Sequence, residues 1–432
     1  MMIGSIIMGP EVAMALDMLK RWTQGLGLGR GESRVVSWRT PAILDRGALG
    51  EACLALDGQG RGLAVWDNAG SLWSMPVGPR TSPALLRTPF GEGGTPQLVM
   101  NAEGRGLALW VARMEGEWQI LGRTLGTGED SAQVIHRTPE AVRHLQGAVD
   151  RRGNALVVWL QRSGDGEHVM AQAFDTRAAA WEQSPTALGA PGGVGASPRM
   201  AVNHREHAMV VWEVQDDLFQ GLVASHHWPN EHLWSDRPVP VVAHATHQHR
   251  VAMDDQGNAM ALWIRPFQGE RSVLEASHYE VQRGEWTEPQ ILATAPLLSH
   301  PQLGSSGDGL GCAAWCQSEG HGPARLMVRE FRSGAWDAQA TCLDQGHAPI
   351  REVALEMEAR GSAGVLAIRE TATGDQVVAW HLDGSWSQPR CFTPALRTRC
   401  TAPRLALCPG GASALWMQGE GADRALVMTE TT

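Results

Sequence analysis

The stretch DDQGNAMALW, from Asp254 to Trp263, joins a turn of acidic, glycine and asparagine residues to a short apolar strand that ends in tryptophan. The same pattern returns elsewhere, for example as DRRGNALVVW from Asp150 to Trp159. Eight copies, some of them weaker, end at Trp66, Trp110, Trp159, Trp212, Trp263, Trp315, Ile368 and Trp416. Successive ends lie 44 to 53 residues apart. This period is typical of propeller blades rather than of helical solenoids.

A second signature in each unit is a tryptophan followed closely by proline or a polar residue, as in WTEPQIL at Trp286 and WSQPRCF at Trp386. Between the two signatures lies a third strand with β-type alternation, such as SVLEASHYE from Ser272. With the strand that precedes the glycine turn, each unit therefore predicts four strands.

The repeats predict an all-β fold, a single β-propeller over residues 33–432. Eight four-stranded blades are the simplest count, and seven remain open because the units after Trp66 and Trp110 lack a clear Trp-Pro strand. The last unit has only three strands, whereas VVSWRTPAIL at residues 35–44 carries the missing signature at Trp38. We expect this amino-terminal strand to complete the last blade, because a ring otherwise leaves an unpaired edge.

Residues 1–32 lie outside the repeats and predict a short helix followed by a glycine-rich linker. Val12, Leu16, Leu19 and Trp22 fall at helical spacing and are candidates for binding a partner protein. Membrane contact would be confined to this helix, and a misassigned start or a poor signal sequence stays open. Because no clear signal peptide or spanning segment is present, we expect a cytoplasmic location.

The composition of the chain limits the classes of molecule that it is expected to bind. The formal net charge is -10 and the basic residues are scattered arginines with a single lysine, Lys20, which argues against nucleic acid. The seven cysteines form an odd set without a CxxC pair and are interpreted as free thiols of a reducing compartment. A bridge from Cys312 or Cys316 to Cys342 stays open. No cofactor motif is found.

Half of the histidines, eight of sixteen, fall between His204 and His249. Among them His244, His247 and His249 are candidate metal ligands, and the alternative is a solvated, pH-responsive loop. The aspartates before the glycine turns, Asp57, Asp150 and Asp254, are interpreted as turn residues that accept backbone N–H bonds. Aromatic residues outside the repeated positions are candidates for stacking on sugar rings: Trp73, Trp118, Trp228 and Trp380.

In these motifs the chain resembles bacterial repeat proteins of the BNR-like, sialidase-type propeller class, in which D-x-x-G-N-A…V-W and G-x-W-x-x-P alternate. The likeness covers roughly residues 35 to 432 and implies the propeller fold. The sialidase Asp-box, Ser-x-Asp-x-Gly-x-Thr-Trp, is not met, because SGDGEH at Ser163 and SSGDGLG at Ser305 lack the Thr-Trp ending. No arginine triad is visible in the sequence.

Three functions follow as hypotheses. The sequence favours a non-catalytic scaffold for protein–protein interaction, which is not an enzyme and uses the amino-terminal helix for docking. The alternative is a carbohydrate-binding, lectin-like propeller with similar pockets between several blades. The third is a glycoside hydrolase-like enzyme that acts in the central channel with converging acids.

Overall fold

The computed structural model describes residues 37–431 except 79–87, 93, 127–131, 165, 190–193, 217, 229–232, 236, 321, 346–347, 394–397 and 410. The part from Ser37 onward forms one compact unit. The expected amino-terminal helix, with Val12, Leu16, Leu19 and Trp22, lies outside the described residues. Within the described part, no helix has the length and apolar character that crossing a bilayer requires.

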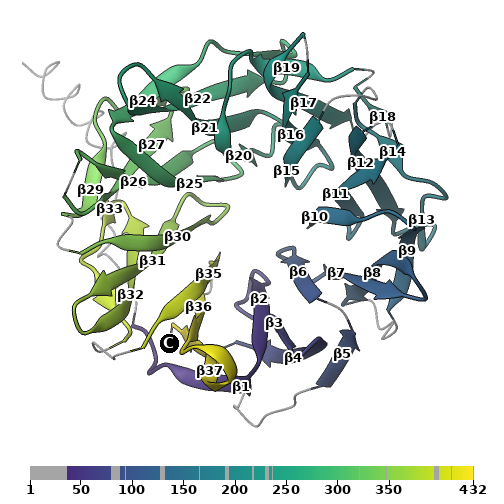
Figure 1. The fold of residues 1–432 in the computed structure, drawn as a ribbon, viewed down its shortest axis with the longest axis horizontal. Coiled ribbons are helices and arrows are strands. Elements are labelled where there is room, and N and C mark those ends of the chain that lie inside the picture. Colours follow the sequence, from purple (N-terminus) through teal and green to yellow (C-terminus); the bar gives the residue numbers. More distant parts are fainter. Residues whose placement is uncertain are drawn as a thin grey trace, which may run out of the picture. The chain divides into compact units, whose positions relative to one another are not determined.

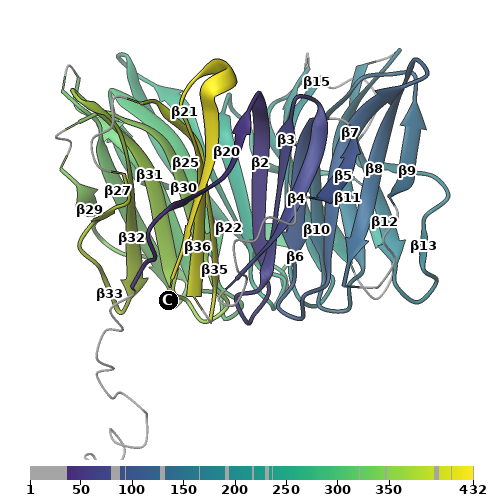
Figure 2. The ribbon, with the colours of Figure 1, turned by 90° about the horizontal axis from the view of Figure 1, so that it is seen from below.

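Eight antiparallel blades form a ring (Figure 1), with their strands running along the ring axis (Figure 2). The innermost strands are β2 (Leu49–Leu56), β6 (Gly94–Met100), β10 (Val142–Val149), β15 (Val194–Val202), β20 (His247–Met253), β25 (Leu297–Ser305), β30 (Ile350–Met357) and β35 (Cys400–Cys408). The second strands are β3 (Gly62–Asn68), β7 (Gly106–Met114), β11 (Ala155–Ser163), β16 (Ala208–Gln215), β21 (Ala259–Phe267), β26 (Gly311–Ser318), β31 (Ala363–Thr371) and β36 (Gly411–Gln418).

The third strands are β4 (Ser71–Val77), β8 (Glu117–Leu125), β12 (Gly166–Asp175), β17 (Gln220–Trp228), β22 (Arg271–Glu280), β27 (Arg325–Arg332), β32 (Gly374–Asp383) and β37 (Arg424–Glu430), the last preceded by the 3-10 turn η1 (Gly421–Asp423). Outer strands of the first two blades are β5 (Thr88–Glu92) and β9 (Gln133–Thr138). In the next five they are split: β13 (Ala180–Trp181) and β14 (Thr186–Ala187), β18 (Leu233–Trp234) and β19 (Val239–Val242), β23 (Glu285–Trp286) and β24 (Gln290–Ala295), β28 (Ala335–Trp336) and β29 (Thr341–Asp344), β33 (Ser385–Trp386) and β34 (Arg390–Cys391).

The eighth blade is closed by β1 (Ala42–Gly47), as the sequence predicts. β1 pairs antiparallel with β37, with Ile43 opposite Val427, and Trp38 forms a further bridge to Thr431. The indole N–H of Trp66, in the first blade, donates to the buried carboxylate of Asp45 at 2.7 Å. The two ends of the chain therefore share one sheet, which removes the exposed edge that an open ring would have.

The repeated tryptophans form the core between the blades. The second-strand tryptophans Trp66, Trp110, Trp159, Trp263, Trp315 and Trp416 are at most 1% exposed. Outer-strand tryptophans pack on the aromatic residue opposite them, for example Trp286 on Tyr279 with ring centroids 5.4 Å apart. The first two blades are complete although their outer strands lack such a tryptophan, because β5 pairs with β4 and β9 pairs with β8. The count of eight blades is therefore confirmed, and the seven-bladed alternative is wrong.

Candidate functional site at the inner strands

Most inner strands end in a tight turn that is capped by the side chain of its first residue. In the fifth blade the Asp254 carboxylate accepts the backbone N–H groups of Gln256 and Asn258, both at 2.9 Å. Gly257 in this turn has φ +94°, a conformation that glycine adopts without steric cost. The corresponding Asp150 accepts the Asn154 N–H at 2.8 Å. The aspartates before the glycine turns are thus structural, as the sequence predicts.

Counting back from these turn residues gives equivalent positions on the innermost strands of all eight blades. Six residues before the turn lie Glu51, Thr95, His144, Ser197, Gln248, His300, Glu352 and Ala402. Four residues before it lie Cys53, Gln97, Gln146, Arg199, Arg250, Gln302, Ala354 and Arg404. We call these sixteen positions the inner ring (innermost strands in Figure 1).

Side chains of the inner ring reach from one inner strand to the next. The amide oxygen of Gln248 accepts the backbone N–H of His300 at 3.2 Å, and the Glu352 carboxylate accepts that of Ala402 at 2.9 Å. Gln146 accepts the Met200 N–H in the same way at 2.9 Å. These contacts confirm that equivalent positions of successive blades are neighbours.

A β-bulge interrupts the alternation of each inner strand at this level. Six residues of the inner ring have a left-handed backbone although none is glycine, with φ of 50° to 56°: Thr95, His144, Ser197, Gln248, His300 and Ala402. Such a conformation costs of order 1 to 3 kcal/mol per residue, and bulges re-aim side chains beside active sites. The inner ring therefore keeps a strained backbone that the rest of the fold holds in place.

Four basic side chains lie on four consecutive inner strands and form what we call the basic arc: His144 on β10, Arg199 on β15, Arg250 on β20 and His300 on β25. Burial lowers the pKa of Arg199, and its Nε has no hydrogen-bond partner in the described part of the chain. Burial, with the like charge of Arg199, lowers the pKa of Arg250 to about 10. The two guanidinium groups therefore repel each other in a partly desolvated place.

The imidazoles at the two ends of the basic arc respond to the same charges. The pKa of His144 is lowered by burial and then by Arg199, and that of His300 by burial and then by Arg250. Both imidazoles are therefore neutral at neutral pH and can accept a proton. Glu213 favours the charged form of Arg199, and Glu167 that of His144. An anion seated between the two arginines would relieve their repulsion.

One carboxyl group stands out on the next inner strand, β30. The residue two before the turn is small or apolar in seven blades (Ala55, Val99, Ala148, Ala201, Ala252, Gly304 and Ala406), but it is Glu356 in the seventh. Its side chain reaches solvent yet is crowded by protein, and this desolvation raises the pKa of Glu356 to about 7. A carboxylic acid half-protonated near pH 7 can donate a proton to a substrate.

The candidate metal ligands do not come together. His244 faces Glu275 at 3.2 Å, whereas His249 is buried between the Glu213 carboxylate and the carbonyl of Val211, each at 3.2 Å. The left-handed backbone at Gln248, within the bulge of β20, interrupts the strict alternation that would place His247 and His249 on one face of the strand. Over the residues that the structure covers, no group of three histidine, cysteine or acidic side chains is arranged to hold a metal ion.

The four stacking candidates fall in different environments. Trp380 is 3% exposed and belongs to the core between the sixth and seventh blades, so its ring is not available to a sugar. Trp73 and Trp118 are half-buried and also pack against core clusters. Trp228 is half-buried and packs on His226 with ring centroids 4.0 Å apart. All seven cysteines are free thiols, so the bridge to Cys342 is not formed.

The basic arc was missed at the sequence level, although the sequence holds a signal for it. Each unit was examined by itself, and a single arginine or histidine in one strand has no meaning there. Aligning the units on their turn residues brings Arg199 and Arg250 into one column and His144 and His300 into another. The basic arc is thus spread over four repeats.

Comparison with solved structures shows what the ring is similar to. An ulvan lyase of polysaccharide lyase family PL25, bound to -[GlcA(1-4)Rha3S]-, superimposes with a TM-score of 0.50 at 9% identity, covering 91% of this chain and 93% of that one. The polysaccharide lyase Uly1 gives a TM-score of 0.50 at 9% identity, with 92% and 99% covered. The Hadza microbial sialidase Hz136 is more distant, with a TM-score of 0.39 at 10% identity and 74% of each chain covered. Neither a protein-family model nor a curated protein sequence matches the chain.

These findings confirm the sialidase-type propeller at the level of the fold and correct the expected function. We expected a non-catalytic scaffold and no enzyme, whereas the similar structures at a TM-score of 0.50 are polysaccharide lyases. The scaffold expectation and the expectation that the chain is not an enzyme are therefore contradicted. At 9% identity the likeness itself shows the fold alone, so the chemistry has to be argued from the inner ring.

Proposed function

We propose that this protein is an enzyme that cleaves an acidic polysaccharide at the basic arc of the inner ring. The observation that carries the proposal is the pair Arg199 and Arg250, which occupy equivalent positions on neighbouring strands, with an unpartnered Nε on Arg199. Two guanidinium groups with fixed geometry suit a carboxylate, which they bind through paired hydrogen bonds. Support also comes from the lyases of the same fold, one of which is bound to an oligosaccharide containing GlcA.

The reaction that the basic arc favours is β-elimination at a uronic acid. The arginines would neutralise the uronate carboxylate, which makes the neighbouring C5 proton more acidic. A neutral imidazole, His144 or His300, would accept that proton. The C4–O bond to the neighbouring sugar then breaks, and the C5 electron pair becomes the C4–C5 double bond of the product. Glu356 is the group we assign to protonate the departing oxygen, because its pKa is about 7.

Hydrolysis is the second candidate, and Glu356 is the observation that favours it. A glycoside hydrolase needs a second carboxylate about 5 to 9.5 Å from the acid. Glu352 lies four residues earlier on the same strand, which places the two Cα atoms about 13 Å apart at the usual rise per residue. The Glu352 carboxylate accepts the backbone N–H of Ala402 on the next inner strand, so it is turned toward that strand and engaged there. Elimination therefore fits the inner ring better.

The experiment is incubation of the purified chain with ulvan, alginate and polygalacturonate, followed by two measurements on the products. Elimination gives both new reducing ends and the ultraviolet absorbance of an unsaturated uronate, whereas hydrolysis gives reducing ends alone. We expect both signals with at least one polymer, and loss of both in the double variant His144→Gln/His300→Gln. Absence of new reducing ends from every acidic polymer would refute the proposal.

The cytoplasmic location stays a prediction, which cell fractionation would test.

A further inference from the structure

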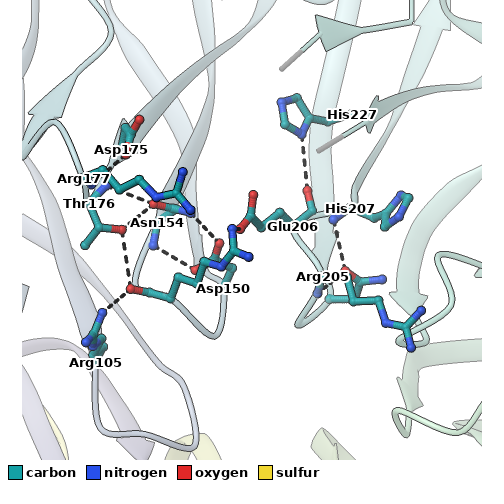
Figure 3. Close-up of polar contacts among 12 residues, drawn as sticks. Arg105, Asp150, Asn154, Asp175, Thr176, Arg177, Arg205, Glu206, His207 and His227 are labelled. Carbon is teal, nitrogen blue, oxygen red and sulfur yellow. Dashed lines mark hydrogen bonds and ion pairs between the residues drawn. The ribbon is translucent and has the colours of Figure 1, made fainter. Parts of the chain in front are cut away.

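A second group of arginines lies at the other end of the ring axis, where the turns after the inner strands meet the turns between third and outer strands. A cleft of about 1160 Å³ opens there between the third and fourth blades. Figure 3 shows how its polar residues lie, with Arg105, Asp150 and Arg177 on one side and Arg205 and Glu206 on the other. Along the inner strands the nearest lining residue, Val202, lies three residues after Arg199, which is about 10 Å from the basic arc.

The cleft has a cause in the sequence of the turns. Asn101 donates its side-chain N–H to the carbonyl of Asp150, and Asn203 donates to that of Asp254, at 2.7 and 2.8 Å. These bonds tie the second turn to the third and the fourth turn to the fifth. The third blade has Asp150 at this position, and a carboxylate has no N–H to donate to the fourth. The turns of the third and fourth blades are joined instead by the ion pair of Arg152 with Glu206 at 3.0 Å.

The carboxylates that line the cleft are used within the fold. Asp150 caps its own turn through Asn154. The Asp175 carboxylate accepts the Arg177 N–H at 2.7 Å, and that of Glu182 accepts the Ala173 N–H at 3.1 Å. Glu206, as described, pairs with Arg152. The N–H bonds hold these carboxylates in place but leave the negative charges of Asp150, Asp175 and Glu182, whereas Glu206 is paired with Arg152.

Five arginines line the same cleft: Arg105, Arg151, Arg152, Arg177 and Arg205. Arg151 pairs with Glu103 at 2.8 Å, and Arg105 donates to the backbone carbonyl of Arg152. Arg177 and Arg205 are exposed and form no ion pair within the residues that the structure describes. With the four carboxylates of the same lining, Asp150, Asp175, Glu182 and Glu206, the formal charge of the cleft is +1 in a chain of net charge -10.

An aromatic ring completes the cleft. Trp181 is half-buried against Phe174, with ring centroids 5.3 Å apart, and lines the cavity beside the imidazoles of His204 and His227. An indole with guanidinium and amide groups around it suits a ring that is apolar on one face and carries carboxylates at its edge. Acidic sugars have this combination, whereas an acidic peptide lacks the flat apolar face.

We infer that this cleft binds a segment of an acidic polysaccharide away from the catalytic centre, and so holds the polymer on the enzyme. The inference rests on the proposed function for the class of ligand. Arg177 and Arg205 would bind carboxylate or sulfate groups of successive sugars, and Trp181 would pack against a sugar ring.

The test compares binding of an alginate hexasaccharide by calorimetry in the wild type, in Arg177→Gln/Arg205→Gln and in Arg199→Gln/Arg250→Gln. Loss of charge-assisted hydrogen bonds should weaken binding at the cleft by about tenfold in the first variant. The second variant should keep the cleft affinity. With the whole polymer, the first variant should raise KM and leave kcat unchanged.

Several outcomes would overturn the inference: equal affinity of the Arg177→Gln/Arg205→Gln variant, equal binding of neutral cellohexaose, or equal binding of polyglutamate. If the wild type cleaves a polymer but the Arg177→Gln/Arg205→Gln variant binds the hexasaccharide as the wild type does, the inference fails and the proposed function stands. Cleft-dependent binding without cleavage of any acidic polymer would instead remove the proposed function. The two failures are thereby distinguished.

Discussion

At the scale of single residues, the chemistry of the ring depends on side chains placed where their ordinary charge is costly. Arg199 and Arg250 stay close to each other because neighbouring strands carry them, although each makes the charge of the other less favourable. Glu356 has no charged partner to offset its desolvation. Such groups destabilise the folded chain and mark a functional site when they gather in one place.

Glu356→Gln should stabilise the protein at neutral and alkaline pH. The folded-state pKa of about 7 lies above the ordinary value of 4.5, so the wild type loses stability as pH rises from 4.5 to about 7. Below pH 4.5 the two proteins should unfold at the same temperature, and above pH 7 the variant should unfold at a higher one. Thermal unfolding across this range checks the prediction, with Glu319→Gln at an exposed position as the control. A difference that does not depend on pH would contradict it.

His226 should make the ring sensitive to acid. It is 4% exposed, contacts His207 at 3.2 Å and the Tyr279 hydroxyl at 3.5 Å, and burial lowers its pKa to about 3. A lowered pKa means that stability is lost as pH falls from 6.5 toward 3. His226→Phe should therefore lose less stability over this range than the wild type does. Chemical denaturation at several pH values measures it, and equal pH slopes would exclude this role.

At the scale of elements, β1 is the strand on which closure depends. Removal of residues 1–47 would leave β37 with an unpaired edge and Trp66 without its acceptor Asp45. We expect this truncation to aggregate and to unfold at a lower temperature, because edge strands pair with other chains. Removal of residues 1–36 should leave the ring unchanged. Size-exclusion chromatography and thermal unfolding of both truncations test this, and equal behaviour of the two would contradict it.

Strands and closure could be predicted because the turn, the tryptophan and the spacing repeat, and because Trp38 supplies the strand that the last unit lacks. The separation of His247 from His249 could not be predicted, since the left-handed backbone at Gln248 is carried by a residue that gives no local sign of it. Trp380 looked like a surface ring because it falls outside the two repeated positions, yet it packs in the core between the sixth and seventh blades, whereas Ile368 faces the core between the seventh and eighth.

At the scale of the whole molecule, the site exists only because eight units close into a ring. His144 and His300 are separated by 156 residues in the sequence. In the ring their strands lie three blades apart, one on each side of the two strands that carry Arg199 and Arg250. A functional reading of one unit at a time finds isolated side chains, which is why the sequence favoured a scaffold. The proposed catalytic residues instead occupy positions that are equivalent by the symmetry of the ring but carry different side chains in different blades.

The central claim is that Arg199 and Arg250 bind the anionic group of the substrate, and Arg404 offers a matched control. Arg404 occupies the same row of the inner ring but pairs with Glu51 at 3.2 Å and lies outside the basic arc. The most direct measurement is kcat/KM of Arg250→Gln and Arg404→Gln on whichever acidic polysaccharide the wild type cleaves. We expect a loss of about 100-fold or more for Arg250→Gln and little change for Arg404→Gln. Equal activity of Arg250→Gln and the wild type would contradict it.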